Sequence, residues 1–379
     1  RVLFRSKIVS AEYAASLVQD GMTVGVGGFF GSGVPEELLI ALQERHRTTQ
    51  SPKELTIFHS AGIGDSAQRG ANHFAEEGMI RKLIGAHLGL APRISKLIMD
   101  NKIVAFMTPQ GVNCQLLRAV AGNKPGVITR VGLGTFVDPR VEGCKANQLT
   151  IDSGEEVVSL INIDGEDFLF FRAIPFNICF IKGTYADEMG NISFVEESII
   201  PDPLEMALAT HNSGGIVIVQ VNKVVAKNTL DAWNVLIHGF MVDYVVVGKP
   251  ENNVQTFDCD HYRPEIAGGL KIPLADIEPM PMSERKICAR RGAMELKKGI
   301  LVNLGVGVGE AVGIIAGEEG ICDKFTFSVE SGPLGGVPIG GKGMGSSYNF
   351  EARYKQCDTF DLYDGGGLDL TCLGAAEID

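Results

Sequence analysis

The feature of the sequence that most constrains its fold is a repeat of whole supersecondary units. Residues 15–21 are echoed by residues 293–299, and in both places a run of β-forming residues, a glycine-rich loop and a helical stretch follow in the same order. A repeat on this scale is typical of two domains that share one fold. The 379 residues are enough for two such domains.

The second copy carries an acidic residue that the first copy lacks. Residues 56–62 line up with residues 326–332, which places Glu330 where the first copy has Ser60. Residues 325–329 predict a short buried strand, and the glycine and proline residues beyond it predict a loop. Glu330 is therefore predicted at the end of a strand. Such an acid is either a solvated strand terminus or a reactive group, and the pattern alone leaves both open.

The loop of the first copy joins a predicted strand to a predicted helix. The strand is expected at 23–26, the glycine-rich loop at 27–33 and the helix at 36–47, with Pro35 in its first turn. The N-terminus of a helix offers unpaired N–H groups and the positive end of the helix dipole, which suit carboxylates and phosphates. An ordinary tight turn between strand and helix is the other interpretation.

The rest of the first copy predicts the fold class. Its β-runs alternate with helical stretches, which indicates a largely parallel sheet covered on both faces. We therefore predict an α/β protein with two related domains, each containing an open, mostly parallel sheet flanked by helices. The further strands are expected at 55–59, 102–107, 157–163, 168–171, 178–181, 215–221 and 243–247.

The repeat also predicts the domain limits. We expect an N-terminal domain at 7–262, a proline-rich linker at 263–282 and a C-terminal domain at 283–379. The second copy stops at about the equivalent of Asp187, so we expect the second domain to be incomplete. Residues 1–6 precede the coherent pattern without an initiator Met, and we interpret them as not native.

Charge and composition exclude several classes of protein. The net charge of −12 argues against nucleic acid or an anionic membrane as a partner. The sequence lacks an apolar run of about 18 residues and a signal-peptide core, so we expect a cytoplasmic protein without a membrane partner. The eight cysteines are scattered without metal-ligand spacing, and we predict no metal site.

Three common motifs fail on spacing. The glycine loops do not fit the dinucleotide-binding pattern, because Phe30 and Glu310 occupy the third glycine position. Residues 336–342 approach a P-loop, but Gly343 replaces the hydroxyl residue that would hold magnesium. The nucleophile elbow of hydrolases does not occur, and His211 and His238 are interpreted as core or surface histidines.

What remains is a carboxylate at a strand end in a glycine-dense loop. That arrangement suits covalent catalysis by the carboxylate itself, because amide donors can stabilise the oxyanion that forms when it attacks a carbonyl. A carboxylate attacks a thioester usefully only when it is desolvated and positioned. The residues thus favour Glu330 as a nucleophile.

The two glycine-rich segments resemble the signatures of a known family. Residues 20–35 closely resemble the first signature of the family I coenzyme A transferases, and residues 328–335 resemble the second, which bears the catalytic glutamate. The similarity runs from about residue 7 to residue 379. Two positions depart from the pattern: Gly25 takes a place that is usually bulky and apolar, and Ser331 replaces an asparagine of the ketoacid-transferring members. The Glu-Ser-Gly form resembles the single-chain acetate or propionate branch, here truncated at its C-terminal end.

The resemblance implies an acyl-CoA:carboxylate CoA-transferase with a ping-pong mechanism. Glu330 is expected to attack the acyl-CoA carbonyl, and the cycle passes through a mixed anhydride to a glutamyl-CoA thioester that an incoming carboxylate discharges. Gln110 is expected to donate to the oxyanion. The other implied site residues are a carboxylate pocket (Gly27, Gly28 and Phe29), a glycine turn with amide donors (Gly365, Gly366 and Gly367) and CoA-binding residues (Gly335, Gly336 and Lys342). Lys342, Arg353 and Lys355 are the nearest cations after Glu330 in the sequence, and either contact with the CoA phosphates or a solvated loop accounts for them.

The same resemblance implies the substrates and partners. They are acyl-CoA and short-chain carboxylates of the acetate or propionate type, with CoA as a substrate, no bound cofactor, and a homo-oligomer of two or four chains. A thioester hydrolase on the same scaffold and a sugar-phosphate-binding or isomerising module stay open as alternatives. Because the second domain is expected to be incomplete, we also expect poor activity from this chain, which full turnover would contradict.

Overall fold

The structure is a computed structural model that describes residues 7–375, apart from the side chain of Lys342. Contacts divide it into two compact units. The first unit contains residues 7–195 and 202–253, and the second contains residues 196–201 and 254–375. The division at 7–262, 263–282 and 283–379 that the sequence suggests remains a prediction.

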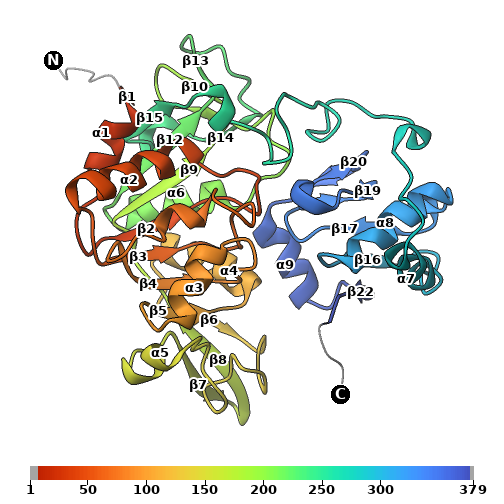
Figure 1. Cartoon of the computed structure of the whole chain (residues 1–379), viewed down its shortest axis with the longest axis horizontal. Coiled ribbons are helices and arrows are strands. Elements are labelled where there is room, and N and C mark those ends of the chain that lie inside the picture. The colour runs from red at the N-terminus through yellow and green to blue at the C-terminus, as the bar shows by residue number, and fades with distance from the viewer. Residues whose placement is uncertain (1–6, 376–379) are drawn as a thin grey trace. The chain divides into compact units, whose positions relative to one another are not determined.

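The first unit is built around a sheet of eight strands (Figure 1). The order across it is β1 (Ile8–Val9), β15 (Tyr244–Val247), β12 (Ile216–Val221), β9 (Ile178–Lys182), β2 (Thr23–Val26), β3 (Leu55–Phe58), β4 (Ile80–Gly85) and β5 (Val104–Met107). Within the described residues, every pairing of neighbours in this sheet is parallel. The strands β3 and β9 are buried along their whole length, which explains why their sequences are apolar apart from Thr56 and Lys182.

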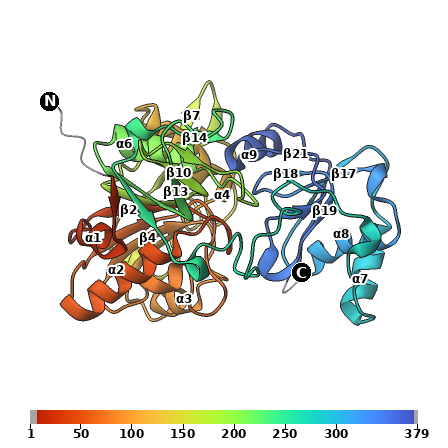
Figure 2. The same ribbon diagram turned by 90° about the horizontal axis from the view of Figure 1, so that it is seen from above.

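Helices cover both faces of this sheet. Helix α1 packs against α2, and α4 packs against α6. Figure 2 shows α2 and α3 on one side of the strands and α6 on the other. The α/β fold class predicted from the sequence is confirmed. The helix bounds are α1 (Ala11–Ser16), α2 (Glu36–Thr49), α3 (Pro92–Met99), α4 (Gln110–Ala121), α5 (Gln148–Asp152) and α6 (Pro203–Asn212).

Two small sheets complete the first unit. One is antiparallel, with the order β6 (Gly126–Thr129), β8 (Glu166–Arg172) and β7 (Val158–Ile163). The other has the order β13 (Lys223–Val225), β10 (Tyr185–Asp187), β11 (Ile192–Ser193) and β14 (Val235–Ile237). The runs predicted at 157–163 and 168–171 thus form a hairpin outside the main sheet.

The second unit contains a five-stranded mixed sheet. The order is β21 (Ala352–Arg353), β18 (Pro333–Leu334), β17 (Thr326–Ser328), β16 (Leu301–Leu304) and β22 (Leu370–Cys372). β16 pairs in parallel with β17 and β22, whereas β18 is antiparallel to both of its neighbours. The other elements are the hairpin β19 (Val337–Pro338) and β20 (Ser347–Tyr348), and helices α7 (Glu284–Ala293), α8 (Val308–Glu318) and α9 (Gln356–Asp364).

Short 3-10 helices occur in both units. In the first unit they are η1 (Ala71–Phe74), η2 (Gly239–Met241) and η3 (Pro250–Asn252). In the second unit they are η4 (Leu274–Asp276), η5 (Cys322–Lys324) and η6 (Gly341–Gly343).

The sequence repeat is reproduced strand by strand and in register. In the first unit Gly25 of β2 is aligned with Phe58 of β3 and with Cys179 of β9. In the second unit Asn303 of β16 is aligned in the same way with Ser328 of β17 and Thr371 of β22. The loops after β2 and β16 also make equivalent hydrogen bonds. Gly27 N donates to Phe180 O in the first unit, and Gly305 N donates to Cys372 O in the second. The two units therefore contain the same three-strand core.

Part of the proline-rich segment that was predicted as a linker is hydrogen-bonded to residues of the second unit. Asn349 accepts a hydrogen bond from Ile272 N at 2.8 Å and donates one to Ile272 O at 2.7 Å. Arg263 donates to the hydroxyl of Tyr348 at 2.6 Å. These contacts place residues 263–272 against β20 and the turn after it, so this part of the segment packs as a component of the second unit.

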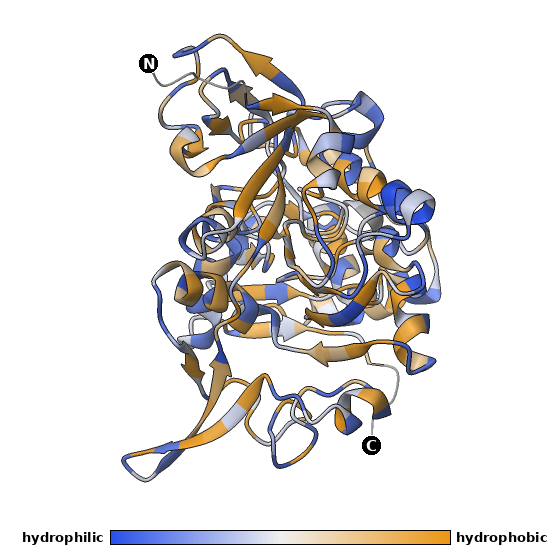
Figure 3. Cartoon of the chain, turned by 90° about the vertical axis from the view of Figure 1, so that its left-hand side faces the viewer, coloured by the Kyte–Doolittle hydropathy of each residue, from blue (hydrophilic) through white to orange (hydrophobic). Residues whose placement is uncertain are grey.

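Hydropathy follows the layers of the fold. Figure 3 shows the apolar colour concentrated on the strands, and the hydrophilic colour on loops and on parts of the helices. The large side chains of Leu38, Leu39 and Leu42 on α2 are fully buried, which gives this helix its apolar face. Among residues 7–375, none of the helices combines the length and the apolar character that a bilayer span requires.

Candidate active site

Glu330 lies directly beyond β17, in a turn that the backbone fixes tightly. Val329 N donates to Pro333 O, and Gly332 N donates to Val329 O. Gly332 has φ of 131°, and a Cβ there would lie 2.1 Å from Tyr354 O, so only glycine fits. The structure therefore places Glu330 just after the end of β17, as the sequence predicts.

The residue after Glu330 anchors the turn from the other side. Ser331 is fully buried, and its hydroxyl donates to Gly345 O at 2.6 Å. The resemblance associates the Glu-Ser-Gly form, which contains Ser331, with the acetate or propionate branch. In the structure the hydroxyl of Ser331 is used to hold the turn, so its contact is with the backbone of its own unit.

The carboxylate of Glu330 is partly shielded from water. The side chain is half-buried, and desolvation raises the pKa of its carboxyl above the usual value. Asn303 opposes this shift, because its Nδ2 donates to Glu330 Oε2 at 3.2 Å and so favours the charged form. A partly desolvated carboxylate with one oriented donor is a stronger nucleophile than one that is fully hydrated.

Asn303 and Tyr363 are site residues that we did not single out from the sequence. Asn303 is nine per cent exposed in β16, and its Nδ2 also lies 3.2 Å from the hydroxyl of Tyr363 on α9. Burial raises the pKa of that hydroxyl. The signal that could have revealed Asn303 is an amide side chain inside an apolar strand, because such a group requires partners. Tyr363 has no comparable signal.

The glycine turn at Gly365, Gly366 and Gly367 closes helix α9. Gly365 N donates to Asp361 O, Gly366 N to Tyr363 O and Gly367 N to Leu362 O. All three amides are therefore occupied by the C-terminal turn of the helix. Their expected role as donors to the reacting carbonyl stays a prediction that requires these bonds to open.

The residues expected to bind CoA lie in the β18–β19 and β19–β20 turns. Gly335 and Gly336 have φ of 77° and 72°, and a Cβ on Gly336 would lie 2.0 Å from Tyr348 O. The fold alone thus requires these glycines. Lys342 belongs to η6, and its side chain lies outside the described part of the chain. Arg353 donates to Glu197 O at 2.6 Å, so this cation is engaged within the second unit.

The glycine loop expected to bound the carboxylate pocket lies in the first unit, directly after β2. Gly27 N donates to Phe180 O. Gly28 has φ of 129°, and a Cβ there would meet Val34 at 2.9 Å. Phe29 is fully buried, and its backbone exchanges two hydrogen bonds with Ser32. The loop is therefore a rigid turn, and its role as a pocket boundary remains a prediction.

Two further residues of the first unit bear on the expected site. Gln110 is the first residue of α4, where the N-terminus of the helix favours negative charge nearby. Gly25 lies within β2, and a Cβ there would come within 2.4 Å of Met206 Sδ on α6. The absence of a side chain at Gly25 thus makes room for Met206 in the core.

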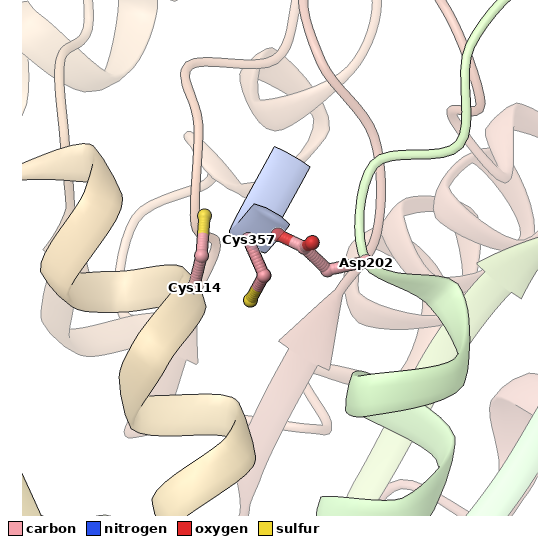
Figure 4. A group of neighbouring side chains, drawn as sticks. All are labelled: Cys114, Asp202 and Cys357. Carbon is pink, nitrogen blue, oxygen red and sulfur yellow. The ribbon is translucent and has the colours of Figure 1, made fainter. Parts of the chain in front are cut away.

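Three buried side chains of metal-binding types are divided between the two units. Figure 4 shows them: Cys114 on α4, Asp202 just before α6, and Cys357 on α9. Cys114 and Asp202 belong to the first unit and Cys357 to the second. Within either unit alone, the described residues contain no group of three such ligands.

Comparison with known proteins decides the family. The sequence model described as Coenzyme A transferase matches residues 8–248. The chain belongs to the coenzyme A transferase family. The resemblance of the two glycine-rich segments to this family is thereby confirmed, and the chain is an enzyme that transfers CoA and uses CoA as a substrate.

Similarity to CoA-transferases over almost the whole of this chain supports this assignment. The caffeate CoA-transferase of Acetobacterium woodii is 44% identical over 374 residues, which cover 99% of this chain and 71% of that protein. The acetate CoA-transferase YdiF of Escherichia coli K12 is 39% identical over 381 residues, which cover 100% of this chain and 71% of that protein.

Solved structures of CoA-transferases match the chain as well. The apoenzyme of the acyl-CoA transferase YdiF from Escherichia coli O157:H7 has a TM-score of 0.90 at 38% identity, with 98% of this chain and 69% of that chain covered. The thioester complex of the same protein with CoA also has a TM-score of 0.90 at 38% identity, with 98% and 72% covered.

Proposed function

We propose that this CoA-transferase moves CoA between a short-chain acyl-CoA and a free carboxylate through a glutamyl-CoA thioester on Glu330. The observation that carries the proposal is the position of Glu330 in a rigid turn, half-buried, with a raised pKa and one oriented amide donor. The solved structure of a similar acyl-CoA transferase is described as a thioester complex with CoA, which supports covalent chemistry in this family.

The first half of the cycle begins when a carboxylate oxygen of Glu330 attacks the carbonyl carbon of the acyl-CoA. The carbon–sulfur bond breaks, and CoA leaves as a thiolate. The product is an anhydride between the acyl group and Glu330. The thiolate then attacks the carboxyl carbon of Glu330, the bond from that carbon to the bridging oxygen breaks, and the first carboxylate leaves with that oxygen.

The second half reverses these steps with a new acid. An incoming carboxylate attacks the thioester carbon of Glu330, CoA leaves as a thiolate, and the thiolate then attacks the new acyl carbonyl. Glu330 is released as a carboxylate, so the protein ends unchanged. Charge is balanced at each step, because one anion attacks and one anion leaves, and the cycle uses neither a metal nor a bound cofactor.

The remaining assignments follow the family resemblance. We propose Gln110 as an oxyanion donor, Gly27, Gly28 and Phe29 as the boundary of the carboxylate pocket, and Lys342 as a CoA contact. We further propose acyl-CoA and acetate or propionate as substrates, a homo-oligomer, and a cytoplasmic location. The name of the YdiF relative supports acetate, whereas the name of the Acetobacterium woodii relative points to an aromatic acid.

Product analysis tests this function and separates it from hydrolysis. Acetyl-CoA is incubated with propionate, butyrate or caffeate, and the new acyl-CoA is measured beside free CoA. A transferase forms the new thioester in proportion to the acetyl-CoA consumed. A thioester hydrolase, the alternative, releases free CoA whether or not an acceptor is present. The acceptor with the highest kcat/KM identifies the substrate class, and caffeate as that acceptor would contradict the short-chain assignment.

A further inference from the structure

A row of three polar side chains crosses the sheet of the second unit beside Glu330. Ser328, Asn303 and Thr371 are aligned on the adjacent parallel strands β17, β16 and β22. Side chains at one level of a parallel sheet point to the same face. Asn303 therefore has a hydroxyl-bearing neighbour on each side, and the row runs along the face on which its amide meets Glu330.

The fold itself does not require this polar row. The equivalent row in the first unit is Phe58, Gly25 and Cys179, in the same register, and all three are buried. The repeat thus builds the same three-strand core with an apolar row in one unit and a polar row in the other. An amide buried in a sheet costs free energy unless its hydrogen bonds are made, so Asn303 needs a reason other than folding.

The neighbours of Asn303 fix the direction of its amide. Nδ2 lies 3.3 Å from Ser328 O and 3.2 Å from Glu330 Oε2, and both of these oxygens only accept hydrogen bonds. On the other side of the amide, the hydroxyl of Thr371 donates to Oδ1 at 3.3 Å. The NH2 group therefore faces the carboxylate of Glu330, and the amide oxygen faces away from it.

Tyr363 holds this arrangement from α9. Its hydroxyl lies 3.2 Å from Asn303 Nδ2 and 2.5 Å from Ser328 Oγ. The phenol thus bridges two members of the row. A donor locked in this way is pre-organised, and a pre-organised donor stabilises developing negative charge without a reorganisation cost in the reaction.

We propose that Asn303 is a catalytic residue that stabilises the oxyanion formed on Glu330 when the glutamyl carbon is attacked. This role rests on the proposed covalent function of Glu330. In the anhydride and in the thioester, one oxygen of Glu330 remains as a carbonyl oxygen. If the other oxygen makes the attack, the remaining one is Oε2, the atom that Nδ2 already contacts.

The step in which Asn303 acts is balanced as follows. The CoA thiolate or an incoming carboxylate forms a bond to the glutamyl carbon, and the carbonyl electron pair moves to Oε2. When the pair returns, the bond to the leaving carboxylate or thiolate breaks. Asn303 keeps its own protons throughout and donates a hydrogen bond that strengthens as charge grows on Oε2. Tyr363, Ser328 and Thr371 are positioning residues.

Discharge of the isolated thioester tests this role directly. The wild type and the Asn303→Ala and Asn303→Asp variants are loaded with CoA by prolonged incubation with acetyl-CoA, desalted, and mixed with acetate, and the rate of thioester loss is measured by intact mass. We expect loss of the donor to slow discharge about 10²-fold or more. Asn303→Asp has nearly the shape of the native side chain, so it covers the case in which the alanine variant folds poorly.

The pH dependence of turnover adds a readout that a purely structural role would not move. Because Asn303 lowers the pKa of Glu330, both variants are expected to shift the acid limb of the kcat/KM profile to higher pH, and Asn303→Asp more than Asn303→Ala. Tyr363→Phe and Thr371→Val should slow discharge less than Asn303→Ala. Asn349→Ala, which removes two hydrogen bonds from the Asn349 side chain to the backbone of Ile272, should lower stability and leave discharge unchanged.

The outcomes separate the two proposals. If the wild type takes up no covalent CoA, the proposed function fails. If the wild type is loaded and discharged normally and both Asn303 variants discharge at the wild-type rate with an unshifted pH profile, the role of Asn303 is refuted while the proposed function stands.

Discussion

Asn303 Nδ2 lies 3.2 Å from Glu330 Oε2, although the two residues are 27 positions apart in the sequence. The parallel pairing of β16 with β17 brings them together, because Asn303 is aligned with Ser328 and Glu330 follows two residues later. A carboxylate that is desolvated by its surroundings thus receives its donor from the next strand. The arrangement favours reactivity at the expense of stability, and several measurable consequences result.

The first prediction concerns the stability cost of Glu330. Its pKa is higher in the folded chain than in the unfolded chain, so the folded state binds more protons between the two values, and stability falls as pH rises through that window. Glu330→Gln removes the charge. We expect a higher Tm than that of the wild type at pH 8 and an equal Tm near pH 4. Thermal unfolding at both pH values checks this, and an equal or lower Tm at pH 8 would contradict it.

The second prediction concerns the turn that carries Glu330. In Gly332→Ala the new Cβ would overlap the backbone oxygen of Tyr354, so the turn or β21 must move. We expect a loss of about 3 kcal/mol or more and a loss of covalent CoA uptake. Gly366→Ala is the matched control, because Gly366 also has positive φ but has nothing within 4 Å of the added atom. It should cost about 1 kcal/mol. Urea denaturation measures both, and equal costs would contradict the prediction.

The third prediction concerns Gly25. An added Cβ would collide with Met206 Sδ, so Gly25→Ala should destabilise the first unit by about 1–3 kcal/mol through overpacking. The acceptor preference should not change, because the position faces Met206. In the double variant with Met206→Ala, the cost should be smaller than the sum of the two single costs. A change in acceptor preference without a loss of stability would show that Gly25 lines the substrate pocket.

The fourth prediction concerns the proline-rich segment. Asn349 makes two hydrogen bonds to the backbone of Ile272, so Asn349→Ala should cost about 1–3 kcal/mol and expose this segment to proteases. Asn349 has φ of 56°, which glycine adopts more easily than alanine. Asn349→Gly should therefore be more stable than Asn349→Ala. Proteolysis near Ile272 that is no faster in Asn349→Ala than in the wild type would show that the segment is held by other contacts.

Much of the local structure could be predicted because it depends on local pattern. The strand predicted at 23–26 and its glycine loop are present, and the repeat is conserved in structure down to the register of three strands. β4 escaped prediction because Arg81 and Lys82 interrupt its apolar pattern. Both cations are paired with Glu155, at 2.6 and 2.7 Å, and this partner is more than seventy residues away in the sequence.

The candidate site was predicted only in part for the same reason. Glu330 follows a recognisable strand and loop, so its position could be inferred from nearby residues. Asn303 gains its role from pairing between β16 and β17, and Tyr363 gains its role from hydrogen bonds to Asn303 and Ser328 on those strands. In the structure the amides of Gly365 to Gly367 are bonded to carbonyl oxygens of α9, and their expected role as donors to the reacting carbonyl stays a prediction. The contacts of Asn303 and Tyr363 are set by tertiary structure, and the local sequence signals only that a buried amide at Asn303 requires partners.

The most direct test of the account is the mass of the protein after incubation with acetyl-CoA. We expect the wild type to gain the mass of covalently bound CoA, and peptide mapping to place it on Glu330. Glu330→Gln should gain no CoA and should lose at least about 10³-fold in transferase activity, because it lacks the nucleophile. Glu330→Asp, which keeps the charge but shortens the side chain, should also be strongly impaired. CoA attached to another residue, or normal transfer by Glu330→Gln, would contradict the account.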